Sequence, residues 1–397
     1  MKLLIAIPAL NEEQSIASIV ERCLAARSDI VAGSSVDAVE ITVVSDGSSD
    51  RTVERAQQYA GEVNVIVFPE NRGYGTAIQE AWRESDAELL GFLDADGTCD
   101  PRFFAALCRE VLDGGADVVL GNRMTRASRM PPLRRLGNRL FGALLSVFSS
   151  HVVHDTASGM RVVRRSSLAK LLPLPAGMDF TPAMSARALL RQDVAIRELP
   201  MPYAEREGRS KLRPWRDGLR FLRTIVESTL LFRPSRPLSL AGAALFLAAA
   251  VLMGPPVAHY LAVGTVEEWM IYRFVVSQLL GSTAVLCWCV AYLARRLMVV
   301  TGFREARPHQ GERLARRFFG GPWFWLAEAA LLLAGFLLVE PSLRSLVTTG
   351  ATYEHWSRFV VMSFLGGTAA ILAVTWLLHR AADLLEAQRE FQSRGGV

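Results

Sequence analysis

The chain has 397 residues, of which 51% are hydrophobic, and it carries a formal net charge of +5. A mean hydropathy of +0.23 is high for a soluble protein and points to membrane-spanning segments. The sequence lacks the aromatic-interleaved basic patches of nucleic-acid modules, so the basic balance favours an anionic membrane surface and no nucleic-acid partner.

Up to about residue 212, short apolar runs alternate with amphipathic helical patterns, which predicts an α/β domain with a largely parallel sheet. The opening run is too short for a signal peptide and lacks a cleavage site, so we expect it to form a strand. The expected strands are Leu3–Ile7, Glu40–Val44, Val63–Val67, Leu89–Leu93 and Asp117–Leu120. The expected helices are Glu12–Ala26, Asp50–Tyr59, Thr76–Glu84 and Pro101–Leu112.

Two segments combine an apolar stripe at helical spacing with nearby arginines. This pattern is typical of helices that lie in the lipid headgroup plane, and an ordinary core-facing helix is the alternative. The first stripe is Leu133, Leu136, Leu140, Leu144 and Phe148, and the second is Trp215, Leu219, Leu222, Val226 and Leu230.

Four later stretches approach the roughly 20 apolar residues that a membrane-spanning helix needs. They lie near Leu238–Val263, Phe274–Leu297, Trp323–Val347 and Phe359–Leu378, and Pro255-Pro256 should kink or end the first. Arginines gather in the loop between the second and third stretches, which predicts that this loop, the α/β domain and both termini are cytoplasmic. The expected divisions are an α/β domain at 1–212, an interfacial helix at 213–235, a transmembrane domain at 236–385 and a tail at 386–397.

Two carboxylates, Asp94 and Asp96, stand directly after the apolar run Leu89–Leu93. In open α/β sheets, ligands bind outside the carboxyl ends of the strands. Carboxylate oxygens suit Mg²⁺ or Mn²⁺, which commonly bridges to substrate phosphates. We therefore expect a divalent metal here, although such a pair alone is weak evidence. Asp100 before Pro101 has a plainer interpretation as a helix N-cap.

Other polar positions leave alternatives open. Asp46, at the end of the second expected strand, could accept hydrogen bonds from a base or a ribose, whereas Asp50 is expected to cap a helix. Gly73 lies just before a helix, where it would permit close approach to a phosphate or form an ordinary turn. A zinc site at His151 and His154 is not favoured, because no third His or Cys ligand is near and the five cysteines form no CxxC pair.

Six motifs follow one another along the chain: IPALNEE at 7–13, VVSDGSSD at 43–50, NRGYGTA at 71–77, FLDADG at 92–97, ASGMRVVRR at 157–165 and REGRSK at 206–211. Together they resemble the polyprenyl-phosphate glycosyltransferases of glycosyltransferase family two, typified by dolichyl-phosphate mannose synthase. The resemblance implies a Rossmann-like GT-A domain of the α/β class, followed here by an all-α transmembrane domain of about four helices.

The implied reaction moves a sugar from a UDP- or GDP-linked donor to a polyprenyl phosphate, undecaprenyl or dolichyl, with inversion. Its products are a polyprenyl-phosphate monosaccharide and a nucleoside diphosphate, and its cofactor is Mg²⁺ or Mn²⁺. The resemblance assigns donor binding to Pro8, Ala9, Glu12, Asp46, Gly73 and Asp94, with Asp94 and Asp96 on the metal. It assigns the phosphates of donor and acceptor to Ser158, Arg161, Arg206, Ser210 and Lys211.

By the same resemblance, the catalytic set is Asp94, Asp96, Arg161, Arg206 and Lys211. Asp155, just before the SGMR motif, could support the site by orienting Arg161 or by approaching the metal, and a purely structural role is the alternative.

Three positions depart from the family pattern. Ser45 replaces an aspartate, Met160 replaces a phenylalanine, and Gly97-Thr98 replaces the commoner Leu-Gln, which leaves a third metal ligand open. A processive polysaccharide synthase is one alternative, although its QxxRW motif is missing, and an inactive membrane scaffold is another. We expect an integral protein of a bacterial or archaeal cytoplasmic membrane, and a homo-oligomer is left open.

Overall fold

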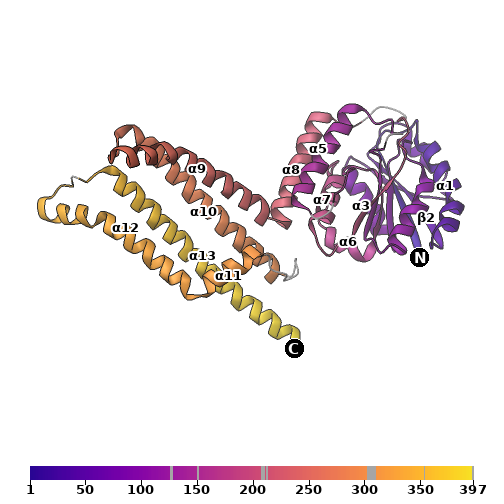
Figure 1. Cartoon of the computed structure of the whole chain (residues 1–397). Coiled ribbons are helices and arrows are strands. Elements are labelled where there is room, and N and C mark those ends of the chain that lie inside the picture. Colours follow the sequence, from indigo (N-terminus) through magenta and orange to yellow (C-terminus); the bar gives the residue numbers. More distant parts are fainter. Residues whose placement is uncertain are drawn as a thin grey trace. The chain divides into compact units, whose positions relative to one another are not determined.

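The computed structural model describes residues 1–125, 128–149, 152–206, 211, 213–301, 310–352 and 354–395. The chain divides into two compact units, Met1–Phe232 and Arg233–Val397. The first is a layered α/β unit and the second consists of helices (Figure 1). The division places the helix expected at 213–235 almost entirely in the first unit.

A seven-stranded sheet forms the centre of the first unit, in the order β3-β2-β1-β4-β6-β5-β7. Its parallel half consists of β1 (Lys2–Ala9), β2 (Ala38–Asp46), β3 (Asn64–Phe68) and β4 (Leu89–Leu93). The mixed half consists of β5 (Val118–Asn122), β6 (Met160–Arg164) and β7 (Ile196–Pro200), with β6 antiparallel to both β4 and β5. The α/β class is as the sequence predicts, but β6 and β7 were not expected.

Helices cover both faces of the sheet, which explains why β4 is apolar throughout and buried at all five positions. One core packs α1 (Ile16–Gly33) and α4 (Phe104–Leu112) against the strands. The opposite core contains α3 (Tyr74–Glu84) and α7 (Phe180–Leu190). The shorter helices are α2 (Thr52–Gln57), α6 (Arg165–Leu171) and the 3₁₀ turn η1 (Pro101–Phe103), which Asp100 caps by accepting from Arg102 N at 3.0 Å.

A third core joins α7 to α5 (Pro132–Phe148) and α8 (Pro214–Phe232). The rings of Phe141 and Phe221 meet edge to face at 6.0 Å, so the two helices lie side by side (Figure 1). Outward, both helices expose apolar side chains: Leu140 is 61% exposed, Leu219 67% and Trp215 85%. The whole stripe predicted for α8 is exposed, whereas the last two residues of the α5 stripe pack partly into the core.

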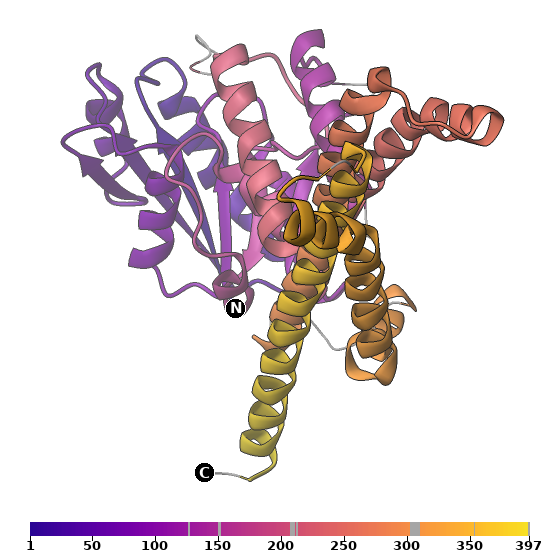
Figure 2. The same cartoon turned by 90° about the vertical axis from the view of Figure 1, so that its left-hand side faces the viewer.

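The second unit is built from α9 (Ser235–Val263), α10 (Ile271–Val300), α11 (Gln310–Gly320), α12 (Pro322–Thr349) and α13 (Trp356–Gly395), with a 3₁₀ turn at Glu268–Met270. Within the described residues, four helices are long and apolar enough to cross a membrane. The last turns of α13 extend beyond the neighbouring helices (Figure 2).

The first spanning helix does not end at Pro255-Pro256, as the sequence suggested it could, but continues to Val263. Pro256 is buried, and about two turns earlier Ala249 O accepts a hydrogen bond of 3.3 Å from Ser277 of α10. The neighbouring helix thus contacts α9 close to the prolines, and contacts of this kind help an apolar helix to tolerate proline.

Candidate active site

A cavity of about 750 Å³ opens at the carboxyl ends of the parallel strands of the first unit. At one end its lining contains every residue expected to bind the donor or the metal, together with two of the expected cationic residues: Pro8, Ala9, Glu12, Asp46, Gly73, Asp94, Asp96, Arg206 and Lys211. Its apolar lining comes from α5 and α8 and includes Leu133, Leu136, Leu140, Leu219 and Leu222. One cavity therefore joins a carboxylate pair to the exposed apolar helices.

Asp94 follows β4 and is only partly exposed. Tyr74 Oη donates to Asp94 Oδ1 at 2.6 Å. Asp94 Oδ2 lies over Gly159, where a Cβ atom would come within 1.7 Å, so the glycine of the SGMR motif makes room for the carboxylate. Burial, and then the charge of Asp96, raises the pKa of Asp94 to about 6. A cation bound beside Asp94 and Asp96 would reduce the repulsion between the two carboxylates.

Asp96 is 5% exposed and is held from two sides. Thr98 Oγ1 donates to Asp96 Oδ1 at 2.6 Å, so the hydroxyl at the position left open by the sequence is directed at the neighbouring acid. Arg206 Nη1 lies 3.1 Å from Asp96 Oδ2, and its Nη2 donates to Glu12 Oε1 at 2.9 Å. Lys211 Nζ is 3.4 Å from the same Glu12 oxygen. Arg206 and Lys211 of the REGRSK motif thus lie against the carboxylates of Glu12 and Asp96.

Asp46 supports the backbone of the glycine turn. Its carboxylate accepts from Arg72 N at 2.6 Å and from Gly73 N at 3.0 Å. Gly73 has a φ of +104°, and a Cβ atom there would approach Ala176 O to 2.4 Å. A glycine is therefore required for the turn that brings residues 71–73 to the edge of the cavity. Ser45, the departure beside it, is fully buried and donates to Ser48 Oγ at 3.0 Å.

Arg161 and Ser158 lie where the sequence did not place them. Both are fully buried, and neither lines the cavity. Arg161 sits in β6 opposite Phe92, and its guanidinium donates to Thr156 O at 2.8 Å and to Ser185 Oγ at 2.9 Å. These contacts hold the segment before β6 in place. In this structure the guanidinium of Arg161 is therefore bonded within the fold, outside the cavity lining.

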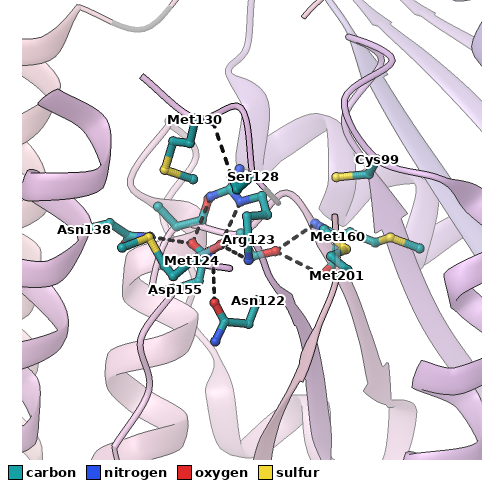
Figure 3. A network of polar contacts seen from close by, with 12 residues as sticks. Cys99, Asn122, Arg123, Met124, Ser128, Met130, Asn138, Asp155, Met160 and Met201 are labelled. Atoms are coloured by element: carbon teal, nitrogen blue, oxygen red, sulfur yellow. Dashed lines mark hydrogen bonds and ion pairs between the residues drawn. The ribbon is translucent and has the colours of Figure 1, made fainter. Parts of the chain in front are cut away.

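Asp155 binds the guanidinium of Arg123. The carboxylate accepts from Arg123 Nε at 2.7 Å and Nη2 at 2.9 Å, and also from Asn138 of α5 at 2.6 Å (Figure 3). Burial alone would raise the pKa of Asp155, but Arg123 and these hydrogen bonds outweigh it and hold the pKa below its usual value. The guanidinium also lies over the ring of Tyr203, 5.3 Å from its centroid.

Sequence reasoning missed Arg123, which lines the cavity. It follows β5 directly, just as the carboxylate pair follows β4, and both strands end at the same edge because β6 is antiparallel to each. Its position directly after an apolar strand was the sequence signal that could have identified Arg123 as a site residue. Arg134 and Arg220 also line the cavity, which brings its basic residues among those described to five, with Arg206 and Lys211.

Two expectations fall on residues outside the described part of the chain, Ser210 and His151. His154 is exposed, and its Nδ1 lies 3.0 Å from Glu198 Oε2. Among the residues that the structure describes, no group of three or more His, Cys, Asp or Glu side chains could hold a metal ion. A metal at Asp94 and Asp96 would therefore need further oxygens from water or substrate.

The model of the family described as Glycosyl transferase family 2 matches residues 4–172. The low-salt glycan biosynthesis hexosyltransferase Agl6 of Haloferax volcanii is 34% identical over 226 residues, which are 56% of this chain and 52% of that one. The dolichyl-phosphate hexose transferase of the same organism is 33% identical over 229 residues, 55% of this chain and 90% of that one.

A crystal structure of glucosyl-3-phosphoglycerate synthase from Mycobacterium tuberculosis, with Mn²⁺, UDP and phosphoglyceric acid, is 24% identical. It covers 58% of this chain and 77% of its own, with a TM-score of 0.45. This chain thus spans about half the length of the first relative and nearly all of the second. By its motifs, the family model and the two Haloferax volcanii relatives, the chain belongs to glycosyl transferase family 2.

Proposed function

We propose that the protein is a membrane-bound glycosyltransferase that moves a sugar from a nucleotide-sugar to a polyprenyl phosphate. The observation that carries this proposal is the cavity that joins Asp94 and Asp96 to the exposed leucines of α5 and α8. A nucleotide diphosphate needs the polar part, and an isoprenoid chain needs the apolar part. The relative whose name states a dolichyl-phosphate acceptor supports the same lipid class.

The acceptor phosphate is the nucleophile. A phosphate monoester has a second pKa of about 6, so near neutral pH it is largely deprotonated and needs no strong general base. One of its oxygens forms a bond to the anomeric carbon as the bond from that carbon to the diphosphate breaks, and the configuration inverts. The electron pair of the broken bond leaves with the nucleoside diphosphate.

The chain must hold two anions together and reduce their repulsion. Arg206 and Lys211, already directed at Glu12 and Asp96, would turn to the donor diphosphate, because arginine forks and lysine ammonium groups both bind phosphate. Arg123, which lines the cavity and is bound by Asp155, would bind the acceptor phosphate.

A divalent ion, Mg²⁺ or Mn²⁺, fits the carboxylate oxygens of Asp94 and Asp96. When bound, it would offset the charge that builds on the departing diphosphate. Pro8, Ala9, Asp46 and Gly73 would form the base and ribose side of the pocket.

The membrane contact would involve the exposed faces of α5 and α8, as well as the four long helices. Leu219 and Trp215 on α8 are among the most exposed apolar side chains of the first unit. Arginines on α11, between the second and third spans, favour a cytoplasmic position for that segment and hence for the catalytic unit and both termini.

The test is transfer of a labelled sugar from UDP- or GDP-linked donors to a lipid phosphate by the purified full-length protein. We expect an organic-extractable product that requires the lipid phosphate and is absent with Asp94→Asn. Polymer formed without a lipid acceptor would instead indicate a processive synthase. Nucleotide binding without turnover of any donor would indicate an inactive scaffold.

A further inference from the structure

The two carboxylates of the proposed metal site are each held on one side by a hydroxyl group. Tyr74 Oη donates a hydrogen bond to Asp94 Oδ1, and Thr98 Oγ1 donates one to Asp96 Oδ1, both at 2.6 Å. The backbone N–H of Thr98 adds a second bond, of 3.2 Å, to the same oxygen of Asp96. Two hydroxyls from different parts of the chain thus converge on one acidic pair.

The phenol of Tyr74 is fixed by the packing of its ring. The ring meets Phe92 and Phe180 edge to face, with centroids 6.4 Å from each and interplanar angles of 86° and 75°. Both phenylalanines are fully buried. Phe92 lies on β4 only two residues before Asp94, so the strand that presents the acid also sets the position of its partner.

The loop that carries Thr98 is fixed from the other side of the sheet. Arg22 of α1 donates to the carbonyl of Gly97 at 3.0 Å and to that of Cys99 at 2.9 Å. Thr98 itself is 2% exposed. Its hydroxyl therefore cannot turn to solvent without disturbing these contacts.

The second oxygen of each acid is left to other partners. Asp96 Oδ2 lies 3.1 Å from Arg206 Nη1. Asp94 Oδ2 lies over Gly159, and within the described part of the chain no donor reaches it. Both acids line the cavity. At Asp94 the hydroxyl of Tyr74 is on Oδ1, which leaves Oδ2 for a cation. At Asp96 the hydroxyl of Thr98 is on Oδ1, and a cation on Oδ2 would replace Arg206 there once Arg206 turns to the donor diphosphate.

We propose that Tyr74 and Thr98 are positioning residues that make Asp94 and Asp96 one-oxygen ligands and so select Mg²⁺ or Mn²⁺ over Ca²⁺. The inference rests on the proposed function, because it takes these two acids as metal ligands. Mg²⁺ demands near-ideal octahedral geometry and uses one or two carboxylates with waters and phosphates. Ca²⁺ takes roughly six to eight oxygens and often both oxygens of one carboxylate, a mode in which it would compete with each hydroxyl for Oδ1.

The test uses the full-length protein in detergent with two variants that remove only the hydroxyls, Tyr74→Phe and Thr98→Val. Thr98→Ser keeps the hydroxyl. Tyr59→Phe is the matched control, because Tyr59 Oη donates to Glu21 at 2.6 Å on the exposed surface, far from the cavity lining. Free Mn²⁺ is measured by electron paramagnetic resonance as Mn²⁺ alone is titrated, and bound Mn²⁺ is then displaced with Ca²⁺.

Mutation of a residue that hydrogen-bonds a metal ligand typically lowers metal affinity by about 10–100-fold. We expect Tyr74→Phe and Thr98→Val each to lower the ratio of Mn²⁺ to Ca²⁺ affinity by about tenfold, and Thr98→Ser and Tyr59→Phe to keep the wild-type ratio. Rescue by serine separates the hydroxyl from the packing of the side chain. If Tyr74→Phe does not fold, the two Thr98 variants decide.

The outcomes separate the positioning role from the metal site. Unchanged ratios in Tyr74→Phe and Thr98→Val, with Mn²⁺ still lost in Asp94→Asn, overturn the positioning role and leave the proposed function standing. An equal loss of affinity for both ions also overturns it, because a merely structural effect would give that result. Wild-type protein that binds no Mn²⁺, or binding that survives Asp94→Asn, overturns the metal site and the inference together.

Discussion

Replacing Asp155 by asparagine tests the buried pair that holds Arg123 at the cavity. The carboxylate is fully buried and accepts from Arg123 N, Nε and Nη2 and from Asn138 Nδ2, at 2.6 to 2.9 Å. Asparagine keeps the shape, but it removes the charge and places an NH₂ donor where only acceptors fit. Arg123 would then be a buried cation without its counter-ion.

The loss expected for breaking a buried pair from one side is about 3–5 kcal/mol. A unit of this size shifts its unfolding midpoint by about 2–4 °C for each kcal/mol, which gives a decrease of roughly 6–20 °C. The pair also has a pH signature. Because the folded pKa of Asp155 lies below its ordinary value of 3.8, its contribution is complete above that pH and is lost as the pH falls through the folded pKa.

Buried cysteines supply the assay. Cys23, Cys99 and Cys108 belong to the first unit, and burial raises the pKa of each thiol to about 12, so they stay unreactive until the unit unfolds. The protein for this assay carries Cys287→Ser and Cys289→Ser. The labelling of its remaining cysteines by a thiol-reactive dye during heating then reports the unfolding of the first unit alone.

The control for this experiment is an exposed ion pair. Glu205 lies 3.7 Å from Arg129 with both side chains largely exposed, and Glu205→Gln should leave the midpoint nearly unchanged. A midpoint for Asp155→Asn that equals the control would refute the argument that the buried pair stabilises the site.

Further predictions concern the reaction. Asp94→Asn or Asp96→Asn should abolish transfer while leaving the protein folded, and full activity of both variants in EDTA would exclude a metal role. Since the pKa of Asp94 is raised to about 6, protons should compete with Mn²⁺ below that pH, so Mn²⁺ affinity, measured by titration, should fall by about tenfold per pH unit there and level off above it. Arg123→Lys keeps the charge but loses the planar fork, and should raise the KM for the lipid phosphate more than the KM for the nucleotide-sugar. Leu219→Glu should impair a long isoprenoid acceptor and spare a short, water-soluble one, and equal loss on both would contradict a lipid-facing α8.

Local patterns were enough to predict the parallel half of the sheet. Apolar runs followed by small or acidic residues located β1 to β5 and the strand-end acids, since each signal lies within one short stretch. The strand β6 was not predicted, because arginine is a residue type of protein surfaces and the burial of Arg161 depends on Thr156 O and Ser185 Oγ. The β7 segment is short and charged, so it has no comparable signal.

The site shows the same limit. Asp46, Asp94 and Asp96 were found because strand ends meet at one edge of a sheet. The partner of Asp155 could not be found, because Arg123 lies 32 residues away and follows a strand whose neighbour had not been recognised. The hydroxyl of Tyr74 was equally hidden, since nothing local shows that a helix-start tyrosine reaches an acid 20 residues later.

The mixed lining of the cavity has a consequence for reversibility. If transfer proceeds as proposed, the two products leave into different phases, the nucleoside diphosphate into water and the glycosylated lipid into the plane of the bilayer. The reverse reaction then requires a soluble product and a membrane product to return to one cavity at once. Its rate depends on a volume concentration for one and a surface density for the other, so the mass of lipid in an assay becomes a kinetic variable in its own right.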